Sequence, residues 1–542
     1  MGEPGTGIHQ APPSKAVARS LCHRTAVRIA TMSDEAVFDA LSDTVYQERR
    51  RLHQLSGRLS EEDAHQMRVI ERAARAIHRD RAAMERAIDA LVKGYAYEIH
   101  NRFSSRAYRL ATRLVPGALT RILTAPNPGD LFGVDLDPTS RVVVHGPVDT
   151  LVDLAQTHTL VLAPTHVSNL DSPFIGYALH LAGLPPFIYG AGLNLFSNPA
   201  MAFFMSRLGA YTVDRRKKNV LYKQALKDYS VDSLSRRCHS LFFPGGTRSR
   251  SGQIEKKLKK GLLGTAIEAW QEGLESNAPN PEILVVPCTL SSSLVLEAET
   301  LIEDSLSEEG KSRHIITDDE FSEPRTVASF ARKVLNLDSA MHVCFGNPLD
   351  VMGNPVDVEG RSWRHKKGQW LDRRAYVTNR MGEVVRDPQR DRVYTEHLAS
   401  ELVKAYHRDN VVLSTHIVSF AAWHLLRSLH PKLDSFHVVL VEEEGRKVSR
   451  SDLLVHIEHL LGAVQKRGLT MVVPSPKGKM ARAEMLLNAA IERFSHYHSR
   501  CAIARVKGGK MLALDPRLIL YYGNRLVGYG FEDDMPVVGE NR

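Results

Sequence analysis

The sequence predicts an α/β fold, because short apolar strands alternate with helices through its central part. Residues 159–163 are apolar and rich in branched side chains, which is the pattern of a buried strand. Pro164 ends this strand, and a helix is expected to open at Leu170 or Asp171, with Asp171 or Ser172 as its N-cap. The same strand pattern recurs at the following positions: residues 141–144, 211–213, 240–243, 283–287 and 342–345.

A helical region is expected before these strands. Residues 32–125 carry many Arg, Glu and Ala, with apolar residues at helical spacing, which predicts two to four helices. Residues 1–31 are rich in Pro, Gly and Ala, and Glu3 is their only acid. We expect a disordered tail there, or an extension upstream of a start at Met32; a transit peptide is the alternative.

Composition restricts the class of partner. The 542 residues include 71 Lys and Arg against 62 Asp and Glu, a net charge of +9, which is mild for this length. Such a charge suits an anionic substrate or an anionic membrane surface, and no nucleic-acid module signature is present, so nucleic acid is not expected as a partner. The five cysteines are scattered without paired spacing, which indicates a reducing compartment and neither a disulfide framework nor a zinc site.

No segment has the pattern of a membrane span. The longest run without Asp, Glu, Lys or Arg, residues 172–206, is interrupted by Pro185, Pro186 and Pro199. A second run at residues 410–426 is short and contains histidines. Both runs are expected to be buried core, and contact with lipid is the alternative. Within the first run, residues 196–208 form an apolar helix that belongs to the core or, alternatively, lines an acyl channel.

The most informative pair is His166 and Asp171, which share the loop between the strand at 159–163 and the following helix. Ligands of open α/β sheets bind at such strand ends. The spacing permits a dyad in which the imidazole is the base and the carboxylate holds its tautomer. His314 and Asp319 have the same spacing, but they lie in a polar, acidic run that is typical of a solvated loop.

Two basic loops follow other strands. Arg215 lies at the end of the strand at 211–213, where an Arg can form bidentate hydrogen bonds to phosphate. The second loop contains two adjacent glycines followed by two arginines. The N–H groups of such glycines can turn toward an anion. The candidate residues of this loop are Gly245, Gly246, Thr247, Arg248 and Arg250.

The ordered blocks resemble the glycerol-phosphate acyltransferase superfamily. They are HVSNLD at 166–171, GAYTVDR at 209–215, FPGGTRS at 243–249 and VVP at 285–287. The resemblance implies a catalytic domain over residues 140–350 with a mixed sheet flanked by helices. It implies catalytic His166 and Asp171, and substrate binding by Arg215, Gly245, Gly246, Thr247, Arg248 and Arg250. No metal or cofactor is implied, and an acyl thioester is the co-substrate.

Two features of these blocks bear on the acceptor. The family motif has Glu where this chain has Gly245. Asp214 before Arg215 resembles lysophosphatidate acyltransferases, whereas TRSRSG at 247–252 resembles the large glycerol-3-phosphate and dihydroxyacetone-phosphate enzymes.

The expected activity is glycerol-3-phosphate O-acyltransfer in phospholipid biosynthesis, with acyl-CoA or acyl carrier protein as donor. Lysophosphatidate or dihydroxyacetone-phosphate acyltransfer is the alternative, and a non-catalytic lipid-binding protein on the same fold is a second. A hydrolase with Ser168 as nucleophile is disfavoured, because no Gly-x-Ser-x-Gly elbow surrounds that residue. We expect a cytoplasmic protein held peripherally on the cytoplasmic face of a membrane.

The remaining chain, residues 351–542, is expected to be a mainly helical C-terminal domain without a catalytic constellation. Helices are predicted at 394–430, 451–465 and 481–495. A strand is predicted at 436–441, and a terminal hairpin at 518–529.

Overall fold

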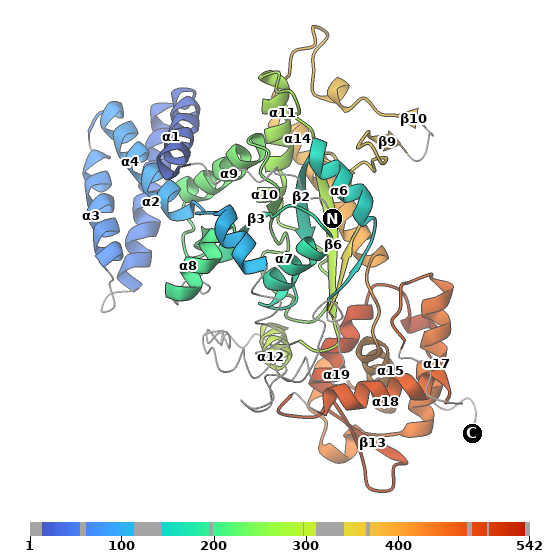
Figure 1. Cartoon of the computed structure of the whole chain (residues 1–542). Helices are drawn as coiled ribbons and strands as arrows, with labels where there is room; N and C mark the ends of the chain where they lie inside the picture. Colours follow the sequence, from blue (N-terminus) through green and yellow to red (C-terminus); the bar gives the residue numbers. More distant parts are fainter. Residues whose placement is uncertain are drawn as a thin grey trace.

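The computed structural model (Figure 1) describes residues 13–54, 61–77, 79–112, 142–193, 199–295, 297–309, 341–364, 369–473, 480–495 and 498–536. Its centre is a mixed sheet in the order β1-β7-β6-β2-β5-β3-β4, with β8 paired to β6. The pairs are parallel except β6 with β7 and β6 with β8. The strands are β1 (Val142–His145), β2 (Thr159–Pro164), β3 (Ile188–Gly192), β4 (Ala210–Val213), β5 (Ser240–Leu241), β6 (Ile283–Ser292), β7 (Met341–Phe345) and β8 (Leu349–Asp350). The predicted mixed sheet flanked by helices is confirmed.

Alternate residues of the central strands pack on opposite faces of the sheet, as strand geometry requires. Leu160 of β2 and Leu284 of β6 contact the core that contains α6 and α7. Val161 and Val285, one residue further along each strand, contact the core that contains α11 and α14. The helices of this part are α6 (Val148–Thr157), α7 (Asp171–Leu181), α8 (Pro199–Arg207), α9 (Val220–Ser235), α10 (Lys260–Leu263), α11 (Thr265–Glu275), α12 (Ala298–Glu309) and α14 (Pro388–Arg408).

Helix α14 lies beyond the predicted domain boundary at residue 350, yet it covers the sheet. Its Leu398 and Leu402 share a core with β2 and β6, and the Tyr406 hydroxyl donates to the Ala163 carbonyl at 2.9 Å. The core around the central sheet therefore extends past that boundary.

The N-terminal helices form a bundle at the β4 side of the sheet (Figure 1, blue). They are α1 (Ser14–Ala30), α2 (Asp34–Gln54), α3 (Glu61–Ala76) and α4 (Arg81–Ile99). The predicted disordered tail at 1–31 is wrong for residues 14–30, because α1 buries Val17 and Leu21 in a core shared with α9. Arg28 also pairs with buried Asp228 of α9 at 2.6 Å.

The part of the C-terminal region from α15 (Ser414–Leu429) onward packs below the sheet in Figure 1, and its secondary structure differs from the prediction at two places. Residues 435–439 are helix α16, because Asp434 caps it by accepting from His437 N–H at 2.8 Å. The predicted hairpin is helix α19 followed by a 3-10 turn, since Asp515 caps a helix that opens with Pro516.

The remaining elements of this region follow the chain from the sheet to the end of the described residues. They are β9 (Trp363–Arg364), β10 (Gln369–Trp370), α15 (Ser414–Leu429), α16 (Ser435–Val439), β11 (Lys447–Ser449), α17 (Arg450–Lys466), α18 (Arg482–Phe494), β12 (Ile503–Arg505), β13 (Met511–Leu514), α19 (Pro516–Gly523) and the 3-10 turn η7 (Asn524–Leu526). The predicted helices at 394–430, 451–465 and 481–495 correspond to α14 with α15, α17 and α18.

Candidate functional site

The predicted dyad forms at the end of β2. His166 follows the strand, Asp171 is the first residue of α7, and His166 Nδ1 lies 2.9 Å from Asp171 Oδ2. The cap of α7 is Leu170 rather than the predicted Asp171 or Ser172. With Nδ1 committed to the carboxylate, Nε2 is the ring atom left to accept a proton, and within the described residues it makes no hydrogen bond.

Asp171 also fixes the loop around the histidine. The same Oδ2 accepts the N–H groups of Val167 at 2.6 Å and Ser168 at 2.9 Å. The side chain is 1% exposed and lies at the N-terminus of a helix, where the dipole favours a negative charge. The carboxylate therefore holds both the backbone of the loop and the tautomer of the imidazole.

The loop after β5 encloses the other side of His166. Phe243 stacks on the imidazole with ring centroids 4.0 Å apart, and Ser249 N–H donates to the His166 carbonyl at 2.8 Å. The first and third motif blocks are thus in direct contact, although they are nearly 80 residues apart in the sequence.

Arg248 reaches the loop through a carboxylate that the sequence analysis missed. Its Nη1 lies 3.0 Å from Oε1 of Glu297, whose side chain is 2% exposed. The same Oε1 accepts from Asn169 N–H at 3.0 Å, and Oε2 of Glu297 accepts from the Ser168 hydroxyl at 2.9 Å. Burial raises the pKa of Glu297, and the charge of Arg248 opposes that rise. The one available signal was that Glu297 is the first charged residue after Glu282 in an apolar stretch.

Arg215 differs from Asp214 and Arg216 because it has no partner among the residues that the structure describes. Arg216 forms the ion pair with Asp214, at 3.0 Å, while the Arg215 guanidinium makes no hydrogen bond or ion pair within the described residues. Its side chain keeps solvent access, yet desolvation by the surrounding protein and the nearby charge of Arg248 lower its pKa. Two guanidinium groups whose charges repel each other can together bind an anionic group such as a phosphate.

The glycine loop is built differently from the prediction. Gly246 has φ +79°, and its N–H donates to the Phe243 carbonyl at 3.0 Å, so this N–H is committed to the turn. The Lys259 side chain lies against Gly246. Thr247 on the same loop is exposed, and Arg250 is partly buried. Of the two glycine N–H groups expected to face an anion, that of Gly246 therefore donates within the loop in this structure.

The hydrogen-bond partners of Glu255 and Ser168 also bear on the chemistry of the site. Glu255 accepts the backbone N–H of His166 at 2.7 Å, a contact that the sequence analysis did not anticipate. The Ser168 hydroxyl donates to Glu297 rather than to His166, which disfavours the hydrolase alternative. The comparison pair His314 and Asp319 lies outside the described residues.

Two negative findings concern the part of the chain that the structure describes. Among those residues, no three His, Cys, Asp or Glu side chains are grouped so that they could hold a metal ion. None of the helices described there is both long and apolar enough to span a membrane.

Comparisons with known proteins find similar sequences for the part of the chain that carries this site. Residues 142–291 match the model of the acyltransferase family. The chain is similar to the glycerol-3-phosphate acyltransferases of Haemophilus ducreyi, 30% identical over 195 residues, and Xylella fastidiosa, 26% identical over 227 residues. These matches cover 36% and 41% of this chain, and 22% and 23% of the relatives. The chain therefore spans less than a quarter of the length of the curated relatives it matches.

One solved structure is also similar. It is the 1-acyl-sn-glycerophosphate acyltransferase PlsC of Thermotoga maritima, at 13% identity, and the match covers 55% of this chain and 92% of that chain with a TM-score of 0.24.

Proposed function

We propose that this chain, whose residues 142–291 form a domain of the acyltransferase family, is a glycerol-3-phosphate O-acyltransferase of phospholipid biosynthesis. The observation that carries the proposal is the buried His166–Asp171 dyad, whose loop is linked through Glu297 to Arg248, and Arg248 is close enough for its charge to lower the pKa of Arg215. A base beside an anion site suits an acceptor with a hydroxyl and a phosphate. The names of the curated relatives support glycerol 3-phosphate as that acceptor.

The proposed reaction is a direct transfer. His166 Nε2 takes the proton of the acceptor hydroxyl, and the oxygen attacks the thioester carbonyl. When the tetrahedral intermediate collapses, the carbon–sulfur bond breaks and the imidazolium returns its proton to the thiolate. Asp171 stabilises the imidazolium and keeps Nε2 directed at the acceptor. Arg215 and Arg248 hold the phosphate, and no acyl-enzyme is required.

The deciding experiment is an acceptor panel with the purified chain. Glycerol 3-phosphate, dihydroxyacetone phosphate and lysophosphatidate are each supplied with acyl-CoA and with acyl carrier protein as donor. We expect the highest kcat/KM with glycerol 3-phosphate. Preference for another acceptor would select one of the alternative transferases. Lipid binding without transfer to any acceptor would instead indicate a non-catalytic lipid-binding protein.

Arg215→Ala should raise the KM for the phosphorylated acceptor by about tenfold or more, because a charge-assisted contact contributes about 1.5–3 kcal/mol. The KM for the acyl donor should change little, and the thermal midpoint should stay the same because Arg215 has no hydrogen bond or ion pair to lose among the described residues. Steady-state kinetics with each substrate varied in turn check this. A change confined to the donor KM would reverse the assignment of the site.

We also propose peripheral attachment to the cytoplasmic face of an anionic membrane, because release of an acylated product into water costs about 0.8 kcal/mol per exposed CH₂. Lys256 and Lys257 are exposed on the segment that follows the third motif block. Lys260 is paired with Glu396 and should contribute less. The five free thiols suit a reducing compartment.

Vesicle co-sedimentation tests this attachment. Binding should require anionic lipid, fall as salt is raised, and weaken in the Lys256→Gln/Lys257→Gln variant, since each charge near such a surface contributes about 1 kcal/mol. Lys260→Gln, the matched control, should have a smaller effect. Binding that is independent of salt and resists carbonate extraction would contradict the electrostatic attachment.

A further inference from the structure

The third motif block has glycine rather than a carboxylate residue at position 245. The side chain of Glu255 lies next to this glycine instead. A Cβ atom on Gly245 would lie 3.0 Å from Cγ and 3.2 Å from Oε1 of Glu255. Distances near 3 Å are shorter than normal contacts between heavy atoms, so a side chain at position 245 and the present side chain of Glu255 compete for the same volume. Gly245 does not have a positive φ, so the backbone itself would accept another residue.

From that position Glu255 binds the backbone of the loop that carries His166, between β2 and α7. Its Oε1 accepts the His166 backbone N–H at 2.7 Å. Its Oε2 is buried and makes no hydrogen bond within the described residues. Burial raises the pKa of Glu255, and this rise is opposed by the His166 N–H and by the charge of Arg525. The Glu255 carboxylate therefore contacts the backbone of His166, whose ring is the proposed base, and not the ring atom that reacts.

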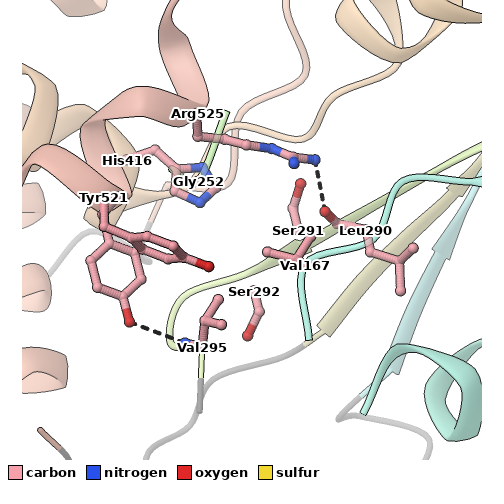
Figure 2. Close-up of a pocket in the computed structure, with 10 residues that line it drawn as sticks. Val167, Gly252, Leu290, Ser291, Ser292, Val295, His416, Tyr521 and Arg525 are labelled. Carbon is pink, nitrogen blue, oxygen red and sulfur yellow. Dashed lines mark hydrogen bonds between the residues drawn. The ribbon is translucent and has the colours of Figure 1, made fainter. Parts of the chain in front are cut away.

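The opposing charge comes from the C-terminal region. Arg525 is buried and is fixed by Nε–H donating to Asn410 Oδ1 at 2.9 Å and by Nη2–H donating to the Leu290 carbonyl at 2.8 Å. Arg525 and Val167, the neighbour of His166, both line a cavity of about 20 Å³ (Figure 2). That volume holds about one water, so this cavity is too small for a substrate. It marks where the C-terminal region meets the catalytic loop.

From this arrangement we propose that Glu255 is a positioning residue for His166, and that glycine at position 245 is what makes room for it. The backbone of His166 is held by Glu255, its ring by Asp171 and by stacking on Phe243. Displacing the backbone anchor moves Nε2 relative to a bound acceptor, and misplacement by about 1 Å can cost about 100-fold in rate. The kinetic part of this inference rests on the proposed transferase function.

The kinetic test uses the full chain and four variants. Glu255→Ala should lower kcat by about 10- to 100-fold with the acceptor KM within about twofold. Gly245→Ala should lower kcat for the same reason, because its methyl group displaces Glu255. The double variant should be no worse than Glu255→Ala alone. Gly261→Ala is the matched control and should behave as wild type, because among the described residues its added Cβ would come within 4 Å only of Lys227 Cε, at 3.8 Å.

Glu255→Gln separates positioning from charge. It keeps an oxygen that can accept the His166 N–H, so it should retain most of kcat. A loss as large as that of Glu255→Ala would overturn the hydrogen-bond role. Losses from Gly245→Ala and Glu255→Ala that multiply in the double variant would overturn the shared volume.

A second readout does not need turnover. In protein labelled with ¹³C at histidine Cε1, the His166 resonance is identified by its absence from His166→Ala. We expect it to move in Glu255→Ala and in Gly245→Ala, and to keep its wild-type position in Glu255→Gln and Gly261→Ala. This pattern without transfer to any acceptor would refute the proposed function and support the positioning role. An unmoved resonance in Glu255→Ala would overturn the positioning role, whatever the activity.

Discussion

Replacing His166 by Ala should lower turnover by at least about 100-fold, because general base catalysis contributes about 10²–10⁴ in rate. The variant removes Nε2, the ring nitrogen that Asp171 leaves available for the acceptor proton. Transfer of labelled acyl groups to the preferred acceptor, measured with saturating donor, checks this result.

The fold should survive the change. Asp171 keeps its hydrogen bonds to the N–H groups of Val167 and Ser168, and Glu255 keeps the backbone N–H of residue 166. The thermal midpoint therefore distinguishes lost chemistry from lost structure. His314→Ala is the control, because His314 has the same spacing to an Asp but lies in the acidic run, and it should leave turnover unchanged. Equal losses in the two variants would contradict the dyad.

The dyad could be predicted from the sequence because it is local. His166 and Asp171 are five residues apart, and the strand pattern before them and the helix pattern after them fix the loop that joins them. The strands that carry the other motif blocks were predictable for the same reason, since runs of branched apolar residues indicate buried strands.

The partners that complete the site could not be predicted, because the chain brings them from far away. Glu255 lies 89 residues from His166, and Glu297 lies 129 residues from Ser168. Neither Glu255 nor Glu297 belongs to a motif. A single sequence does not indicate that these residues contact the loop of His166 and Ser168. Arg525 lies in a segment predicted as a hairpin, where the Asp515 cap and Pro516 instead open a helix.

Arg248→Ala should destabilise the protein, in contrast to Arg215→Ala. Arg248 neutralises Glu297, whose carboxylate is buried and, among the described residues, would keep the Ser168 hydroxyl and the Asn169 N–H as its hydrogen-bond donors. Loss of one partner of a buried pair costs about 3–5 kcal/mol, and the lower end applies here because the Arg248 side chain is 24% exposed. Urea unfolding should show this loss, together with an increased acceptor KM.

The double variant Arg248→Ala/Glu297→Gln separates the two roles of Arg248. The Gln side chain carries no charge, its oxygen can accept the Asn169 N–H, and its amide NH₂ can donate to the Ser168 hydroxyl oxygen, so most of the lost unfolding free energy should return. The acceptor KM should stay high, because the guanidinium that holds the phosphate is still absent. If stability does not recover, the charge of Glu297 is not what Arg248 compensates. If KM recovers with stability, Arg248 supports the loop and does not bind the acceptor, which would leave Arg215 as the principal phosphate contact.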